Sequence, residues 1–97
     1  MKVRYSVRKK VYKRDNYTCV YCGRKADQII ERKSPTYLIT LMLNDDWRPF
    51  EIDHKKPRCL GGSNHMRNLL TSCAKCNNKK SGKPYKQFLL EQKESIF

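Results

Sequence analysis

A chain of 97 residues with 38% hydrophobic and 32% charged residues has little apolar material for a core, so we expect one domain, residues 1–97, that needs a metal or another cross-link for stability. The net charge of +13, from 22 Lys and Arg against 9 Asp and Glu, favours a polyanionic partner, either nucleic acid or an anionic membrane surface. The longest nearly apolar stretch, residues 37–43, is too short to cross a bilayer, which argues against a membrane-spanning segment.

The chain begins with a predicted helix followed by a tight turn. Valines at every fourth position from residue 3 to residue 11, surrounded by basic side chains, predict a short helix over residues 5–14. Asp15 and Asn16 interrupt that pattern. The sequence Cys-Val-Tyr-Cys-Gly at residues 19–23 then has the form of a zinc knuckle, in which Gly23 can adopt a positive φ.

The middle of the chain predicts strands joined by a turn. Residues 24–36 are polar and show no clear pattern. Residues 37–43 are rich in β-forming side chains and predict a strand, residues 44–46 predict a turn, and residues 47–52 predict a second strand. We interpret residues 24–50 as an inserted or extended hairpin that either enlarges the core or helps to select the substrate.

The last third predicts one more strand and two helices. The loop Gly-Gly-Ser-Asn at residues 61–64 leads to a short strand over residues 69–72. Ser72 is expected to cap a helix that carries residues 76–80 and ends before the following glycine and proline. Apolar side chains at helical spacing predict a C-terminal amphipathic helix over about residues 84–95. These side chains are Tyr85, Phe88, Leu89 and Ile96.

Four of the five cysteines fall in two CxxC pairs, Cys19/Cys22 and Cys73/Cys76. The chain opens on a basic segment without the apolar stretch of a signal peptide, so we expect a cytoplasmic, reducing setting in which such pairs bind metal. Two pairs predict one tetrahedral site with four cysteine ligands, and because all four positions are filled, its Zn²⁺ would be structural. Buried cysteines without a ligand and a redox-active pair are the alternatives. Cys59 is left over as an unassigned thiol.

The segment Phe50–Lys80 carries a series of spaced motifs. A strand ends in Asp-His, a loop with Pro and Gly-Gly follows, then Asn-Leu, and then CxxC-Asn-x-x-Lys. Together with the Val11–Gly23 segment that leads through the first CxxC pair, this order resembles the HNH endonuclease family over about residues 7–82. The resemblance implies an α+β fold, a small zinc-stapled treble-clef or ββα-metal domain with flanking N- and C-terminal helices.

The residue types of these motifs suit the hydrolysis of a phosphodiester. We predict a metal-dependent DNA endonuclease in which neutral His54 takes a proton from water. Asp53 and the amide oxygen of Asn77 would hold a divalent ion, and hard oxygen ligands indicate Mg²⁺ or Mn²⁺. That ion would polarise the phosphate and stabilise the departing 3′ oxygen. The resemblance implies that Asn68 orients the loop bearing His54 and that Lys80 contacts a phosphate oxygen.

Basic side chains around these motifs are expected to contact DNA phosphates. Phosphate contacts position a duplex without reading its sequence, and we find no separate reading module, so we expect modest specificity. One active site per chain favours nicking over double-strand cleavage. The predicted contacts are Arg8, Lys9, Lys13, Lys55, Arg58, Lys79 and Lys80.

Two other functions stay open. A zinc-stabilised module that binds DNA or RNA without cutting would have the same charge and cysteines, but it would not need Asp53, His54 and Asn77 together. An adaptor to a larger phage or mobile-element protein is suggested by the resemblance alone, and a homodimer is a further option. His65 has no place in the motif and is interpreted as a surface-loop residue.

Overall fold

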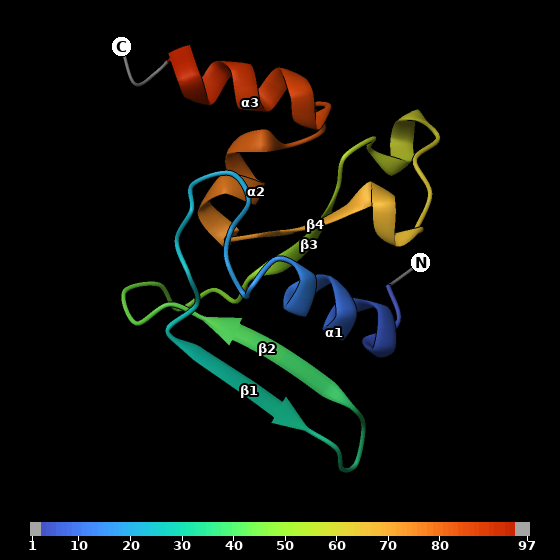
Figure 1. The fold of residues 1–97 in the computed structure, drawn as a ribbon, viewed down its shortest axis with the longest axis vertical. Helices are drawn as coiled ribbons and strands as arrows, with labels where there is room; N and C mark the ends of the chain where they lie inside the picture. Colours follow the sequence, from blue (N-terminus) through green and yellow to red (C-terminus); the bar gives the residue numbers. More distant parts are fainter. Residues whose placement is uncertain (1–2, 95–97) are drawn as a thin grey trace.

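The computed structural model describes residues 3–94, of which residues 92–94 are described by their backbone alone. These residues form three α-helices, two short 3-10 helices and four strands, which confirms the α+β class (Figure 1). In chain order the elements are α1 (Tyr5–Arg14), β1 (Gln28–Arg32), β2 (Leu38–Met42), β3 (Glu51–His54), η1 (Arg58–Leu60), η2 (Met66–Asn68), β4 (Leu69–Ser72), α2 (Ala74–Lys80) and α3 (Tyr85–Glu94).

The strands form two separate antiparallel pairs. β1 pairs with β2, with Gln28 opposite Met42, and β3 pairs with β4, with Glu51 opposite Ser72. Helix α1 packs against both β2 and β4 and therefore joins the two pairs. Figure 1 shows the β1–β2 hairpin on one side of α1, and β3, β4, α2 and α3 on the other. The sequence β3–β4–α2 is the ββα order that the motifs predicted.

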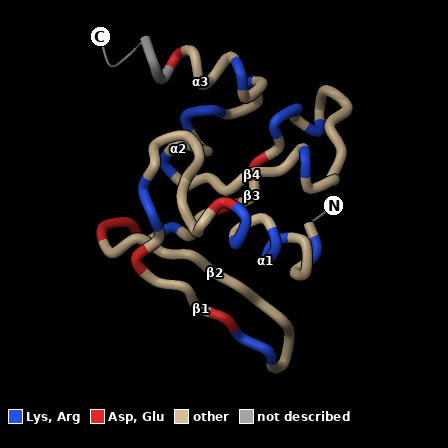
Figure 2. The backbone as a smooth tube through the Cα atoms, viewed as in Figure 1, with Lys and Arg blue, Asp and Glu red and all other residues tan. Residues whose placement is uncertain are grey.

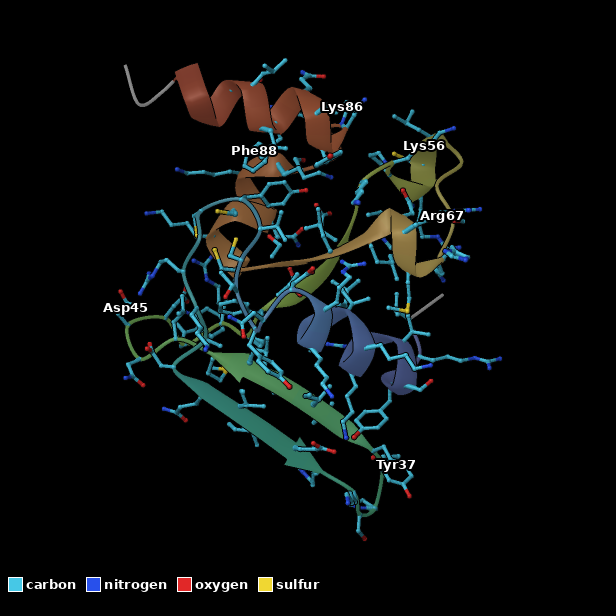
Figure 3. The ribbon with its side chains drawn as sticks, in the orientation of Figure 1. Tyr37, Asp45, Lys56, Arg67, Lys86 and Phe88 are labelled. Atoms are coloured by element: carbon cyan, nitrogen blue, oxygen red, sulfur yellow. The ribbon has the colours of Figure 1, made fainter. Side chains whose placement is uncertain are left out.

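The core lies where α1, the two strand pairs and the C-terminal helices meet. Tyr12, Leu41 and Leu70 are at most 1% exposed and pack in one cluster with the cysteines. Phe88 points from α3 toward this cluster (Figure 3), and its ring meets that of Tyr21 edge-on, with centroids 4.8 Å apart. The C-terminal helix therefore packs back on the domain as predicted, whereas residues 95–97, which include Ile96, lie outside the described residues.

The middle of the chain differs from the sequence prediction. Residues 24–36 contain strand β1, which pairs with β2, the strand predicted over residues 37–43 and observed over residues 38–42. All five side chains of β1 are exposed, so the alternation that reveals a half-buried strand is missing there.

The strand expected over residues 47–52 was placed too early, because β3 begins only at Glu51 and continues to His54. Asp46 accepts hydrogen bonds from both the backbone N–H and the guanidinium of Arg48, and Pro49 has no N–H for a strand ladder. These features keep residues 47–50 out of the sheet.

The cap expected for α2 was also wrong. Cys73, not Ser72, is the residue before the helix, and it makes no side-chain cap hydrogen bond. The Ser72 hydroxyl donates instead to the Cys73 carbonyl at 3.0 Å. Ser72 is the last residue of β4 and completely buried, so its side chain cannot reach the N–H groups of the first helical turn.

Candidate functional site

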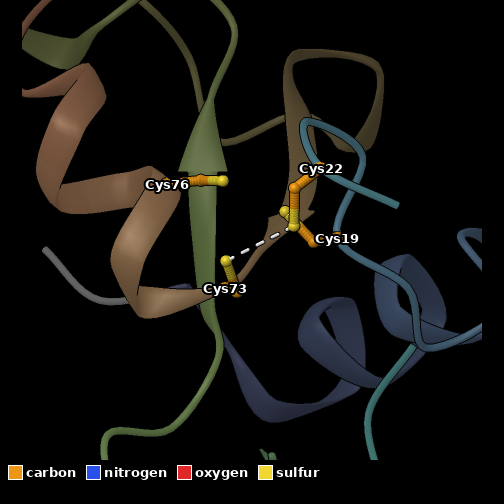
Figure 4. Close-up of side chains that lie close together, drawn as sticks. All are labelled: Cys19, Cys22, Cys73 and Cys76. Carbon is orange, nitrogen blue, oxygen red and sulfur yellow. Dashed lines mark hydrogen bonds between the residues drawn. The ribbon is translucent and has the colours of Figure 1, made fainter. Parts of the chain in front are cut away.

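The four cysteines of the two CxxC pairs meet at one point (Figure 4). Cys19 and Cys22 come from the turn after α1, and Cys73 and Cys76 from the junction of β4 with α2. All four Sγ atoms lie within 4.8 Å of one another, with 3.8 Å between those of Cys22 and Cys73, and no disulfide joins them. A zinc tetrahedron with Zn–S bonds of about 2.3 Å has edges of about 3.8 Å. The cluster therefore has the dimensions and the chemistry of a zinc site with four cysteine ligands.

The local backbone and the thiol pKa values fit that interpretation. Gly23 has φ 80°, and its N–H donates to the Cys19 carbonyl at 2.8 Å, which closes the knuckle. Burial raises the pKa of Cys22 to about 11. The hydrogen bond between Cys19 and Cys76 lowers the pKa of Cys19 and raises that of Cys76. Cys22 and Cys76 therefore keep their protons when no cation is bound, and a bound Zn²⁺ would displace them.

Strand β3 and helix α2 face each other through two pairs of polar side chains. Glu51 and Asp53 alternate with Ile52 and so share one face of β3, and Asn77 and Lys80 are neighbours on one face of α2. The Asn77 amide nitrogen donates to a Glu51 carboxylate oxygen. The Lys80 ammonium lies 3.2 Å from Asp53 Oδ2 and 3.3 Å from Oδ1. No hydrogen bond joins Asp53 to Asn77 within residues 3–94.

The expected phosphate contact of Lys80 does not fit this position. Lys80 is 1% exposed, and its ammonium also donates to the His54 carbonyl at 3.1 Å. It is not part of a solvated face either. Its place on the inner face of α2 directs the ammonium to the end of β3, where it binds both Asp53 and the backbone of His54. In this structure Lys80 therefore holds the end of β3 in place.

Asp53 receives a further hydrogen bond from the cysteine knuckle. The Tyr21 hydroxyl donates to Asp53 Oδ2 at 2.5 Å, and the Asp53 side chain is nearly buried, with the residue 8% exposed. Burial and this hydrogen bond raise the pKa of Tyr21 far above its usual range, so the hydroxyl stays a donor at ordinary pH. The motif analysis gave no role to Tyr21, and only its position between two predicted zinc ligands could have drawn attention to it.

His54 ends β3 and its side chain is half-buried. Its Nε2 lies 2.7 Å from the Asn64 amide oxygen. Because an amide oxygen only accepts hydrogen bonds, Nε2 carries the proton, and in the neutral ring Nδ1 keeps the free lone pair. Asn64 lies in the predicted Gly-Gly-Ser-Asn loop, but nothing in the sequence pattern pointed to this contact.

Asn68 closes the loop that follows His54. Its Oδ1 accepts from the Lys56 N–H at 2.9 Å, and its Nδ2 donates to the carbonyls of Ser63 at 2.7 Å and Lys56 at 3.2 Å. The backbone of Asn68 also accepts from the Lys55 N–H at 2.7 Å. Gly62 is required in this loop, since a Cβ there would lie 1.7 Å from the Lys56 carbonyl oxygen. Asn68 thus binds both ends of the loop from Lys56 to Ser63. This loop leads directly to Asn64, which contacts the His54 ring.

These positions follow the pattern of a known family. The HNH endonuclease family model matches residues 19–83, which is more than half of the chain. The chain belongs to the HNH endonuclease family. The match runs from the first cysteine of the knuckle past the end of α2 and so includes both CxxC pairs, His54 and Asn68. No curated protein and no solved structure matched the chain.

A surface hollow of about 470 Å³ opens beside the site formed by β3 and α2. Glu51 and Asn77 line it from β3 and α2, and Arg48 lines it from the preceding segment. Its lining is mainly polar, and the Asp46 carboxylate holds the Arg48 guanidinium at 3.1 Å. The hollow therefore leaves Asn77 in contact with solvent, whereas Asp53 is nearly buried and does not line it.

The predicted DNA contacts differ in how accessible they are. Figure 2 shows Lys and Arg on all three helices, whereas acidic residues gather near the 44–46 turn. Lys9 is bound to Glu31 of β1 at 2.9 Å, and the guanidinium of Arg8 packs over the Tyr12 ring. Lys13 and Lys79 are exposed and belong to no ion pair among the described residues.

Lys55 and Arg58 flank the Pro of the HNH loop. The Lys55 ammonium lies 5.5 Å from the centre of the Tyr85 ring, and Arg58 is exposed at the start of η1. Cys59 is exposed in the same turn, and the described residues give it no place in the cysteine cluster. His65 is exposed, as expected, and its Nδ1 accepts from the Arg67 N–H at 3.2 Å, which caps η2.

The helices of the described residues can be compared with the requirements for crossing a membrane. None of their helices combines the length and the apolar character needed to cross a bilayer.

Proposed function

We propose that this HNH protein is a metal-dependent DNA endonuclease in which His54 acts as the general base. The observation that carries the proposal is the contact between His54 Nε2 and the Asn64 amide oxygen at 2.7 Å. Because Nε2 is bound to Asn64, the basic atom is Nδ1, and Asn68 holds the loop that supplies Asn64. A module that only bound DNA would have no use for an imidazole oriented in this way.

Proton transfer at His54 can be followed atom by atom. Nδ1 accepts a proton from the water that attacks phosphorus, and the ring becomes an imidazolium. The Asn64 oxygen continues to accept from Nε2–H and so stabilises the positive charge. The half-exposed ring then returns the proton to solvent. General base catalysis of this kind contributes roughly 10²–10⁴-fold to the rate.

The second component is a divalent ion held by Asp53 and Asn77. Glu51 is an acceptor only, so it binds the nitrogen of the Asn77 amide and leaves the oxygen as the atom available to a cation. A carboxylate and an amide oxygen are hard ligands that suit Mg²⁺ or Mn²⁺. When bound, the ion would neutralise charge on the phosphate and stabilise the departing 3′ oxygen. Glu51 was absent from the sequence prediction and belongs to this centre as a support for Asn77.

The cysteine cluster is proposed to hold a structural Zn²⁺. Four sulfur ligands leave no coordination position for a substrate, so this ion would act through stability alone. Structural zinc sites of this type have apparent binding free energies of about 10–16 kcal/mol, which is large for a fold of this size.

DNA is proposed to lie across the face that carries His54 and the hollow at Asn77. Exposed Lys13 and Lys79, with Lys55 and Arg58 near the HNH loop, would contact phosphates on either side of the cut. A single centre per chain would cut one strand at each encounter. The product expected from one chain on supercoiled DNA is therefore a nicked circle.

The test is nicking of supercoiled plasmid by zinc-loaded protein with Mg²⁺ or Mn²⁺ added, with His54→Ala alongside. His54→Ala should keep its fold and its zinc, bind DNA with unchanged affinity, and cut about 10²–10⁴-fold more slowly. Cutting by His54→Ala at the wild-type rate would refute the assignment of the base. A zinc-loaded wild type that bound DNA but failed to cut it with any divalent ion would favour the non-catalytic binding module.

A further inference from the structure

We propose that Tyr21 is a positioning residue for Asp53 and that it links the cysteine knuckle to the catalytic centre. The inference rests on the proposed function, because it gives Asp53 the role of a ligand for the divalent ion. It adds that the residue holding this ligand belongs to the zinc-binding turn, outside β3 and α2.

The position of Tyr21 is fixed from several sides. Its sequence neighbours Val20 and Cys22 belong to the knuckle, and the Val20 N–H donates to the Thr71 carbonyl of β4 at 3.0 Å. The ring is 9% exposed and packs edge-on against Phe88. From this fixed ring the hydroxyl donates to Asp53 Oδ2 at 2.5 Å. The zinc-binding turn therefore determines where the donor for Asp53 lies.

Tyr21 and Lys80 hold the Asp53 carboxylate together. The Lys80 ammonium is 3.2–3.3 Å from both carboxylate oxygens, and the Tyr21 hydroxyl binds Oδ2 alone. The tyrosine thus distinguishes the two oxygens and fixes the rotation of the carboxylate about its last bond. Groups that orient a metal ligand in this way typically change metal affinity by about 10–100-fold when they are removed.

The chain offers a matched pair of tyrosines for a test. Tyr21→Phe removes only the hydroxyl that binds Asp53 and keeps the ring against Phe88. Tyr12→Phe removes a hydroxyl from a similarly buried ring of α1, whose partner is the Arg8 guanidinium at 3.3 Å. Each variant loses the hydrogen bond of one tyrosine hydroxyl and keeps its ring in the core, so Tyr12→Phe controls for a general loss of stability.

The experiment measures Mn²⁺ affinity by electron paramagnetic resonance on zinc-loaded protein, with zinc content and plasmid nicking determined on the same samples. Tyr21→Phe should retain its zinc, bind Mn²⁺ about 10–100-fold more weakly, and recover its nicking rate as the Mn²⁺ concentration is raised. Tyr12→Phe should keep the wild-type Mn²⁺ affinity. Asp53→Asn identifies the portion of Mn²⁺ binding that belongs to this centre.

Two results would overturn the inference alone. One is wild-type Mn²⁺ affinity in Tyr21→Phe, and the other is an equal loss of affinity in both tyrosine variants, each next to a wild type that cuts with Mn²⁺. A wild type whose Mn²⁺ binding did not depend on Asp53 and that did not cut would overturn the proposed function, and the role of Tyr21 with it.

Discussion

The cysteine cluster and the candidate catalytic centre share helix α2, yet they are built in opposite ways. Cys73 and Cys76, at the start of this helix, join two more thiols in a closed group of four identical ligands. Asn77 follows directly in the chain, and in the proposed function it would contribute a single amide to a centre with mixed ligands beside a hollow of about 470 Å³. As proposed, the cysteine cluster would be a closed structural site, and the catalytic centre would be open to water and phosphate.

On these proposals, a small domain separates stability from chemistry over a single helical turn. Four sulfur ligands satisfy a zinc ion completely, so the closed centre contributes to stability and excludes substrate. In the proposed function, one carboxylate and one amide would leave coordination positions free, so the open centre would exchange its ion and bind a phosphate. Changes at the closed centre should therefore affect folding, and changes at the open centre should affect the rate of cutting.

The largest effect is expected at the closed centre, for Cys76→Ser. The substitution removes one of the four proposed zinc ligands, and zinc sites of this type have apparent binding free energies of about 10–16 kcal/mol. We expect loss of zinc and of the native circular dichroism spectrum. Cys59→Ser is the matched control, since its thiol is exposed and lies outside the cluster. A Cys76→Ser protein with native stability would contradict the structural role of the cluster.

The next effect concerns Lys80, which lies at the boundary of the two centres. Lys80→Met leaves the nearly buried Asp53 carboxylate without its cationic partner, which should lower the free energy of unfolding by about 3 kcal/mol. Urea denaturation of the zinc-loaded protein measures it. If Lys80 contacted DNA instead, the variant would keep its stability and bind DNA more weakly.

Asn68→Ala tests the open centre without touching its chemistry. The variant loses the hydrogen bonds that fix the segment from Lys56 to Ser63, so His54 should lose its Asn64 partner and its orientation. A misplacement of about 1 Å can cost roughly 10²-fold in rate, and we expect a loss of that order in single-turnover cleavage with zinc content unchanged. A wild-type cleavage rate would mean that the loop holds its shape without Asn68.

The smallest effect is expected for Lys79→Met, next to Lys80 in the chain but exposed. Removal of one phosphate contact should reduce the slope of log affinity against log salt by about one and leave the stability unchanged. Fluorescence anisotropy with a labelled duplex at several salt concentrations measures the slope. The opposite pattern, loss of stability without a change in slope, would mean that the two lysines have been assigned the wrong way round.

Features that depend on local sequence were predictable. The two CxxC pairs, the positive φ of Gly23 and the strand at residues 69–72 each follow from a few neighbouring residues, and the structure contains all three. Strand β1 was missed because all its side chains are exposed and give no alternating pattern. Its existence depends on pairing with β2, which the sequence of β1 does not reveal.

The contacts within the site depend on the fold as a whole. The motif named Asp53 and Asn77, but the partners that orient them, Tyr21 and Glu51, are 32 and 26 residues away along the chain. The resemblance implied that Lys80 contacts a phosphate oxygen, and the packing of α2 on β3 buries this side chain. A sequence motif gives the order of the site residues along the chain. Which side chains contact one another in the site is determined only when the helices and strands pack together.

The most direct test of the difference between the two centres is plasmid cleavage by zinc-loaded protein during a brief pulse of chelator, with zinc release followed by a colorimetric reagent. We predict that cutting stops when Mg²⁺ is withdrawn, while zinc and the circular dichroism spectrum stay unchanged, and that it resumes when Mg²⁺ alone is restored. Cutting that continued without Mg²⁺, or that returned only with added zinc, would contradict the division between a closed structural centre and an open catalytic one.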